Sequence, residues 1–177
     1  MPEFVQFFRL FVGAPSDVTN EHSIIRGLVE EWNRDHGPAM RARLEFMNWR
    51  THTYPAAGDR PQALVNEQAV DRSDIVAGLF RSRFGSPTGV ADSGTEEEIR
   101  RGIRQRKEVM VYFASLPKPK QRRGRGELAR IEAFKRKYGE HALYHVYTDD
   151  AAFEAAFRQH LAATMNKLLE KYPSPVK

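Results

Sequence analysis

The sequence predicts a doubly wound α/β domain built on a five-stranded, all-parallel sheet. Five short apolar runs alternate along the chain with longer segments of helical periodicity. The runs are close to continuous rather than strictly alternating, as is typical of strands that are buried on both faces. The length of 177 residues suits one domain with a substantial core.

The apolar runs are rich in Val, Phe, Tyr and Ile. They place the five strands at residues 8–12, 44–49, 75–80, 109–114 and 143–147.

Five helices are expected between and after the strands. Residues 20–35 carry an apolar stripe, and the Gly-Pro pair that follows ends the helix. A second helix begins at Pro61, since proline suits the first helical position. A third begins at Ser93 or Thr95, and residues 127–138 and 150–172 supply the last two.

The commonest order for five such strands is 2-1-3-4-5, which puts the topological switch between strands 1 and 3. Ligands of these sheets bind beyond the carboxyl ends of the strands at that switch. The loops expected there are residues 13–17, 48–60 and 81–95. Residues 115–126, after strand 4, are expected to be a disordered loop.

Residues 1–172 are expected to form the domain, and residues 173–177 a tail or linker to a longer protein. The apolar N-terminus lacks a basic leader, so no signal peptide is expected. No apolar run is long enough for a membrane helix, and the chain has no cysteine. We therefore expect a cytoplasmic protein without thiolate metal sites, and the six histidines show no metal-binding spacing.

The net charge of +5 comes from one basic segment, residues 118–137. The remainder of the chain is slightly acidic. Segments of this kind are usually solvated loops and helix faces, so specific nucleic-acid binding is not expected.

The first motif is GAPSD, which closes strand 1 and opens the first helix. Its small residues Gly13 and Ala14 let a ligand approach the backbone, and Ser16 or Asp17 can cap the helix. The motif is either a ligand-binding loop or a plain strand-to-helix turn. It has neither GxGxxG nor GxxxxGK[ST] spacing, so it is not a phosphate loop.

The second motif is FGSPTGVADSGTEEEI, a long polar loop that enters a helix with three glutamates in its first turns. Ser93 with Glu96, and Thr95 with Glu98, both have capping-box spacing. Capping alone explains the acidic cluster, but it does not explain such a long Gly/Ser/Thr loop at the switch point.

The segment DSGTEEEI resembles the DSGTxxEI element of nucleoside 2-deoxyribosyltransferases. The order of GAPSD, DIV, RFG, SGTEEE and VYF resembles the TIR-like N-terminal domain of bacterial STAND-type defence ATPases. Nearly the whole chain takes part in this resemblance. It departs at Ala14, where serine is more usual.

The resemblance implies a TIR-like fold and an NAD glycohydrolase that serves as a bacterial defence effector, with Glu98 as the catalytic residue. A carboxylate suits this chemistry because it stabilises or traps an oxocarbenium-like sugar. The nearby helix N-terminus is expected to keep Glu98 ionised. Glu97 and Glu96 point in other directions around the helix, so only one of the three is expected to face the cleft.

The remaining expected site residues would contact the substrate. Trp49, placed at the end of strand 2, can stack on a base or a nicotinamide ring, or it is a tryptophan at the rim of the core. Arg83 can hold a phosphate, or it is solvated. The full set of expected substrate-binding residues is Gly13, Ala14, Ser16, Asp17, Trp49, Arg83, Ser93 and Thr95.

Two alternatives to NAD cleavage remain open. One is a nucleoside deoxyribosyltransferase or N-glycosidase that uses the same Glu98. The other is a non-enzymatic TIR-like adaptor, in which the glutamates only cap the helix and the domain self-associates. NAD is expected as substrate and no cofactor is expected. The resemblance also implies sites completed by a neighbouring copy, and a sensor or ATPase as a further partner.

Overall fold

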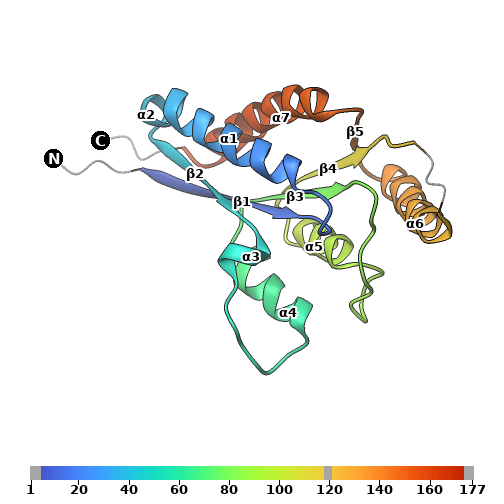
Figure 1. Ribbon diagram of the computed structural model, residues 1–177. Coiled ribbons are helices and arrows are strands. Elements are labelled where there is room, and N and C mark those ends of the chain that lie inside the picture. The colour runs from blue at the N-terminus through green and yellow to red at the C-terminus, as the bar shows by residue number, and fades with distance from the viewer. Residues whose placement is uncertain (1–4, 118–120, 174–177) are drawn as a thin grey trace.

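The computed structural model describes residues 5–117 and 121–173, and it confirms the doubly wound α/β fold. All neighbouring strands are parallel, and the sheet order is β2-β1-β3-β4-β5. The strands are β1 (Gln6–Gly13), β2 (Ala42–Met47), β3 (Ile75–Phe80), β4 (Glu108–Ala114) and β5 (His145–Tyr147). β1 and β3 are therefore adjacent, with the topological switch between them (Figure 1).

The helical segments follow the alternation expected from the sequence. They are α1 (Asn20–Asp35), α2 (Gly37–Met40), α3 (Trp49–His52), α4 (Pro61–Val65), the π-helical turn η1 (Asn66–Val70), α5 (Gly94–Arg104), α6 (Arg122–Gly139) and α7 (Asp150–Lys171).

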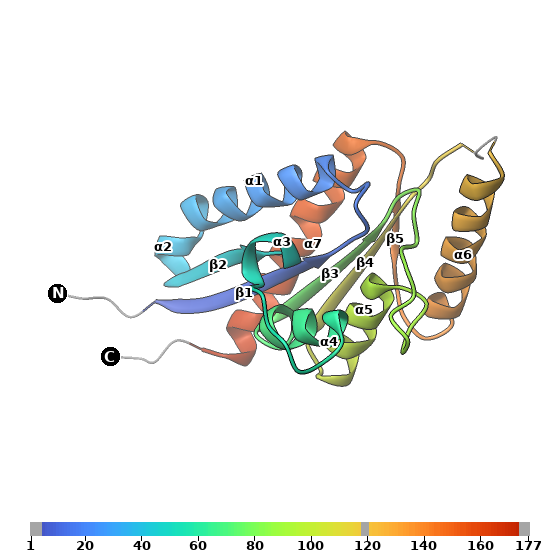
Figure 2. The same ribbon diagram turned by 60° about the horizontal axis from the view of Figure 1, so that its bottom comes forward.

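Helices cover both faces of the sheet, so the molecule has three layers (Figures 1 and 2). On one face, α1 and α7 pack together against the sheet, with Ile25, Leu28 and Phe157 in the core. On the other face, Ile99 of α5 and Phe134 of α6 pack with aromatic residues of β3 and β4. Burial on both faces explains why the strand sequences are nearly continuous in apolar residues.

Several boundaries differ from the sequence-based expectation. Strand β2 ends at Met47, because Asn48 accepts the Thr51 backbone N–H and so caps α3. Strand β5 begins at His145, which leaves Leu143 exposed. The loop expected at residues 115–126 is in part the first turns of α6, which begins at Arg122.

The expected helix at residues 127–138 is the larger part of α6, but its first residues, RRGRG, were assigned to the loop because they carry no apolar stripe. Its position is fixed further along, where Ile131 and Phe134 enter the core. Residues 118–120 and 174–177, which hold part of the expected loop and most of the expected tail, lie outside the described residues. Within the ranges 5–117 and 121–173, no helix combines the length and apolar character needed to cross a bilayer.

Candidate functional site

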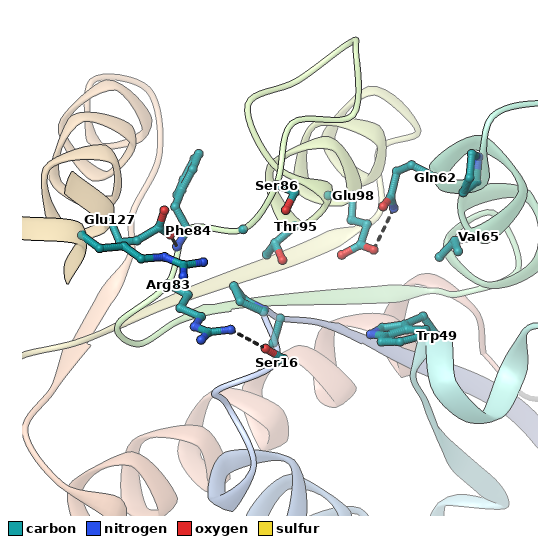
Figure 3. Close-up of a pocket in the computed structure, with 16 residues that line it drawn as sticks. Ser16, Trp49, Gln62, Val65, Arg83, Phe84, Ser86, Thr95, Glu98 and Glu127 are labelled. Carbon is teal, nitrogen blue, oxygen red and sulfur yellow. Dashed lines mark hydrogen bonds between the residues drawn. The ribbon is translucent and has the colours of Figure 1, made fainter. Parts of the chain in front are cut away.

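A cavity of about 440 Å³ lies at the carboxyl ends of β1 and β3, at the topological switch. Its wall comes from the loops after β1 and β3, from α3 and α4, and from the first turns of α5 and α6. Of the expected site residues, the structure brings together Ala14, Ser16, Trp49, Arg83, Thr95 and Glu98 in this wall (Figure 3).

Helix α5 brings its first turns to the cavity because its start is tightly fixed. Ser93 has an extended backbone at the N-cap, and its hydroxyl accepts the Glu96 N–H at 3.1 Å. Ser93 is buried and does not line the cavity, so the structure gives it a capping role rather than the expected contact with a ligand.

Glu98 is a buried ionisable residue in the wall of the cavity. Its side chain is 4% exposed, and its Oε1 accepts a hydrogen bond from Gln62 Nε2 at 3.0 Å. Figure 3 shows the carboxyl group between Thr95 and Gln62, turned toward the open space of the cavity. Among the residues that the structure describes, no Lys or Arg pairs with it.

Burial raises the pKa of Glu98 to about 8, and the negative charge of Glu97 adds to the rise, while the hydrogen bond from Gln62 opposes it. The expectation that the helix N-terminus keeps Glu98 ionised is therefore wrong for the free protein. Glu98 is the fifth residue of α5, beyond the free N–H groups of the first turn, where the helix dipole acts most strongly. Desolvation outweighs what remains of that effect.

Gly13, the last residue of β1, makes room for this carboxyl group. A Cβ atom at position 13 would lie 2.1 Å from Glu98 Oε2. Gly13 was expected to let a substrate approach the backbone. In the structure, the group that approaches it is Glu98.

The other two glutamates face away from the cavity. Glu97 accepts hydrogen bonds from Arg60 Nη2 at 2.7 Å, Asn66 Nδ2 at 2.9 Å and Thr88 Oγ1 at 2.5 Å. Burial by itself would raise the pKa of Glu97, but these bonds, led by the one from Arg60, outweigh burial and hold it below its ordinary value. Glu97 thus ties α4, η1 and the long loop after β3 to α5.

Glu96 completes the start of α5. Its carboxylate accepts the Asp92 N–H at 3.0 Å and pairs with Arg100 at 2.5 Å. Three consecutive glutamates therefore have separate environments, and only Glu98 faces the cavity. This confirms the expectation that one of the three would do so.

Asp17 has a different role from the expected one. Its Oδ2 accepts hydrogen bonds from the backbone N–H and the hydroxyl of Ser82, at 2.8 and 2.7 Å. This joins the loops that follow β1 and β3. Neither Ser16 nor Asp17 caps α1, whose N-cap position is Thr19.

Trp49 lies on the rim of the cavity, although not at the end of a strand as expected. It is the first residue of α3, and its side chain is 45% exposed. The indole faces the open space from the side opposite the α5 residues (Figure 3). An exposed aromatic ring at a cavity mouth is available for stacking on a planar ligand.

Gln62, Phe84, Arg123 and Glu127 also line the cavity, and sequence reasoning missed them. Pro61 did indicate the helix that presents Gln62, but nothing in its motif indicated which face of that helix turns inward. Arg123 was hidden in the segment expected to be a disordered loop. For residues 5–117 and 121–173, no cluster of three His, Asp or Glu side chains is placed to hold a metal ion.

A known family matches most of the chain: residues 20–162 match the family described as "Domain of unknown function (DUF4062)". This description names neither TIR domains nor nucleoside deoxyribosyltransferases. No curated protein matches the chain.

Thirteen chains of solved structures match this chain, among them two that cover nearly all of it. The first is the translation elongation factor SelB of Methanococcus maripaludis in its apo form, with a TM-score of 0.55 and 10% identity over 98% of this chain. The second is Era of Aquifex aeolicus bound to GDP and AlF4-, with a TM-score of 0.46 and 11% identity over 97% of this chain. The chain spans 38% of the SelB chain and 59% of the Era chain. At this identity, the likeness to SelB shows the fold alone.

Proposed function

The chain belongs to the DUF4062 family, whose description assigns no activity, and from the site itself we propose that it is an NAD glycohydrolase. The observation that carries the proposal is the buried carboxyl group of Glu98. It faces a cavity at the topological switch, beside the backbone of Gly13, and has no cationic partner among the described residues. The motif resemblance suggests NAD as the substrate, and the chemistry of the site is compatible with it.

The proposed reaction breaks the bond between C1′ of the ribose and the ring nitrogen of nicotinamide. The bonding electrons leave with nicotinamide, which departs as a neutral base, and the sugar passes through an oxocarbenium-like state. The Glu98 carboxylate stabilises that positive charge. Water then adds its oxygen to C1′ and releases a proton, which gives ADP-ribose.

This step needs an ionised Glu98 carboxylate, and the positive charge of the bound substrate would favour that ionisation. Glu98 is mostly protonated in the free protein at neutral pH, because its pKa is about 8. The nicotinamide ring of NAD is positively charged, and an opposite charge within a few ångströms favours the ionised form of a carboxyl group. Binding of NAD would therefore drive the proton off Glu98. Trp49 offers its ring to the planar nicotinamide from the rim.

One observation favours a second candidate, an N-glycosidase or deoxyribosyltransferase that acts on neutral nucleosides. A protonated Glu98 can donate its proton to a departing base, which neutral nucleosides need and NAD does not. The two candidates thus require opposite protonation states of one residue.

The test measures base release from NAD and from deoxynucleosides at several values between pH 6 and 9. Chromatography quantifies the released base. For NAD cleavage, kcat/KM rises with pH and levels off above about 8, the pKa of the free carboxyl group. For neutral nucleosides, kcat/KM falls above the same pH. Glu98→Gln should lower base release at least about a hundredfold in either case.

Glu96→Gln is the matched control. It sits two residues away on the same helix but faces Asp92 and Arg100 instead of the cavity, so most activity should remain. Full activity in Glu98→Gln would place the catalytic role elsewhere. No base release from any substrate would favour the adaptor, in which the first turns of α5 serve only its stability.

A further inference from the structure

A second cavity, of about 330 Å³, lies next to the first, beyond the carboxyl ends of β3 and β4. The two cavities have three lining residues in common, Arg83, Arg123 and Glu127. These three side chains form a shared wall between the cavities. Arg83 comes from the loop after β3, and the other two come from the first turns of α6.

The two arginines of the shared wall are available to an anion. Arg83 and Arg123 are exposed, and neither pairs with a carboxylate of any residue that the structure describes. The polar contact of Arg83 is with the Ser16 hydroxyl, at 3.3 Å (Figure 3).

Glu127 does not neutralise these arginines, because it is engaged elsewhere. Its Oε2 accepts the Phe84 backbone N–H at 2.7 Å, and its Oε1 accepts from Arg130 Nη1 at 3.1 Å. Arg81, at the edge of the second cavity, is likewise paired, with Glu21 at 2.8 Å. Two unpaired guanidinium groups therefore remain at the boundary, and guanidinium groups bind phosphate oxygens in a bidentate manner.

The second cavity has the character of a base-binding pocket. Leu116, Pro117 and Leu128 give it apolar surface for the face of a planar ring, and Gln121 gives it an amide for hydrogen bonding. Among the residues that the structure describes, Glu127 is the acid that lines it, and its carboxylate is already held by Phe84 and Arg130. The second cavity is suited to hold a nucleoside and not to cleave it.

We propose that the second cavity binds the adenosine half of a dinucleotide whose diphosphate lies at Arg83 and Arg123. This inference rests on the proposed function, because it places the scissile ribose beside Glu98 in the first cavity. A dinucleotide has two nucleosides joined by a diphosphate. The structure has two adjacent cavities, and at their boundary lie two arginines that pair with no carboxylate of the described residues. A simple nucleoside would contact neither the two arginines nor the second cavity. The site should therefore bind dinucleotides more tightly than nucleosides.

The test combines direct binding with a comparison of two substrates, using wild-type protein and the double variant Arg83→Gln/Arg123→Gln. Calorimetry measures binding of ADP, which has the adenosine and the diphosphate but no scissile nicotinamide bond. We expect wild-type protein to bind ADP and the double variant to bind it at least about tenfold more weakly. The ratio of kcat/KM for NAD to that for nicotinamide riboside should fall by a similar factor.

Arg136→Gln is the control, because Arg136 is an exposed arginine near the other end of α6. It should leave ADP binding and the substrate ratio unchanged. Equal ADP binding by wild-type protein and the double variant, or no ADP binding by wild-type protein, would overturn the proposal. If ADP binds through the two arginines but no nicotinamide is released, the nucleotide pocket stands and the glycohydrolase proposal fails.

Discussion

At the scale of single residues, the burial that raises the pKa of Glu98 also makes the stability of the fold depend on pH. Its pKa is about 8 in the folded protein, whereas an ordinary glutamate has a pKa near 4.5. The folded state therefore binds a proton more tightly than the unfolded state does. The stability contributed by this proton is complete below pH 4.5 and is lost as the pH rises through about 8.

Glu98→Gln should remove this pH dependence, because glutamine does not titrate. Between pH 4.5 and 8, the free energy of unfolding of the wild-type protein should fall relative to that of the variant by up to about 1.4 kcal/mol per pH unit. Urea unfolding of both proteins at pH 5, 6, 7 and 8 measures the difference. A constant difference would mean that Glu98 has an ordinary pKa and is ionised at neutral pH.

At the scale of elements, the site depends on how closely α5 lies on the sheet. Glycines of two strands lie beneath the helix. A Cβ at Gly13 would meet Glu98 Oε2 at 2.1 Å, and one at Gly78 would meet Ile99 Cδ1 at 2.4 Å. Gly102 brings the helix itself close to Val76 of β3. This close packing is what sets the Glu98 carboxyl group against the end of β1.

Gly13→Ala tests that placement. The added methyl group would displace the end of a flexible side chain, so stability should change by no more than about 1 kcal/mol. Base release should fall about a hundredfold, since a shift of about an ångström in a catalytic group has effects of that order. Gly27→Ala on α1 is the control, because a Cβ there meets nothing within 4 Å. Wild-type activity in Gly13→Ala would show that the carboxyl position beside Gly13 is unimportant.

Much of the fold was predictable from the sequence, because apolar periodicity reports burial directly. Strand β3 and helix α1 have the expected bounds, and the sheet order is the expected one. The site was predictable only in part. Glu98 was identified from its motif, but its protonation depends on its burial beside Gly13 and on the opposing hydrogen bond from Gln62, and both residues are distant in the sequence. Arg123 was missed because a helix start without apolar residues resembles a loop.

At the scale of the whole molecule, an exposed aromatic residue lies at the first cavity and another on the loop that follows α3. Trp49 is 45% exposed and Tyr54, on the loop that follows α3, is 62% exposed. Aromatic residues with arginine nearby are typical of protein interfaces, and Arg50 lies over the Trp49 ring at 5.4 Å. A second copy of the chain packed on this loop would deepen the cavity around a long substrate.

Activity should therefore rise with protein concentration. A cavity of about 440 Å³ at the carboxyl ends of the strands leaves part of a dinucleotide exposed, and a neighbour that covers Trp49 and Tyr54 would enclose more of its nicotinamide half. Nicotinamide released per molecule, measured over about a hundredfold range of concentration, should increase as light scattering detects association. Trp49→Ala should weaken both effects together. Substantial turnover by a proven monomer at every concentration would reject the shared site and leave the role of Glu98 intact.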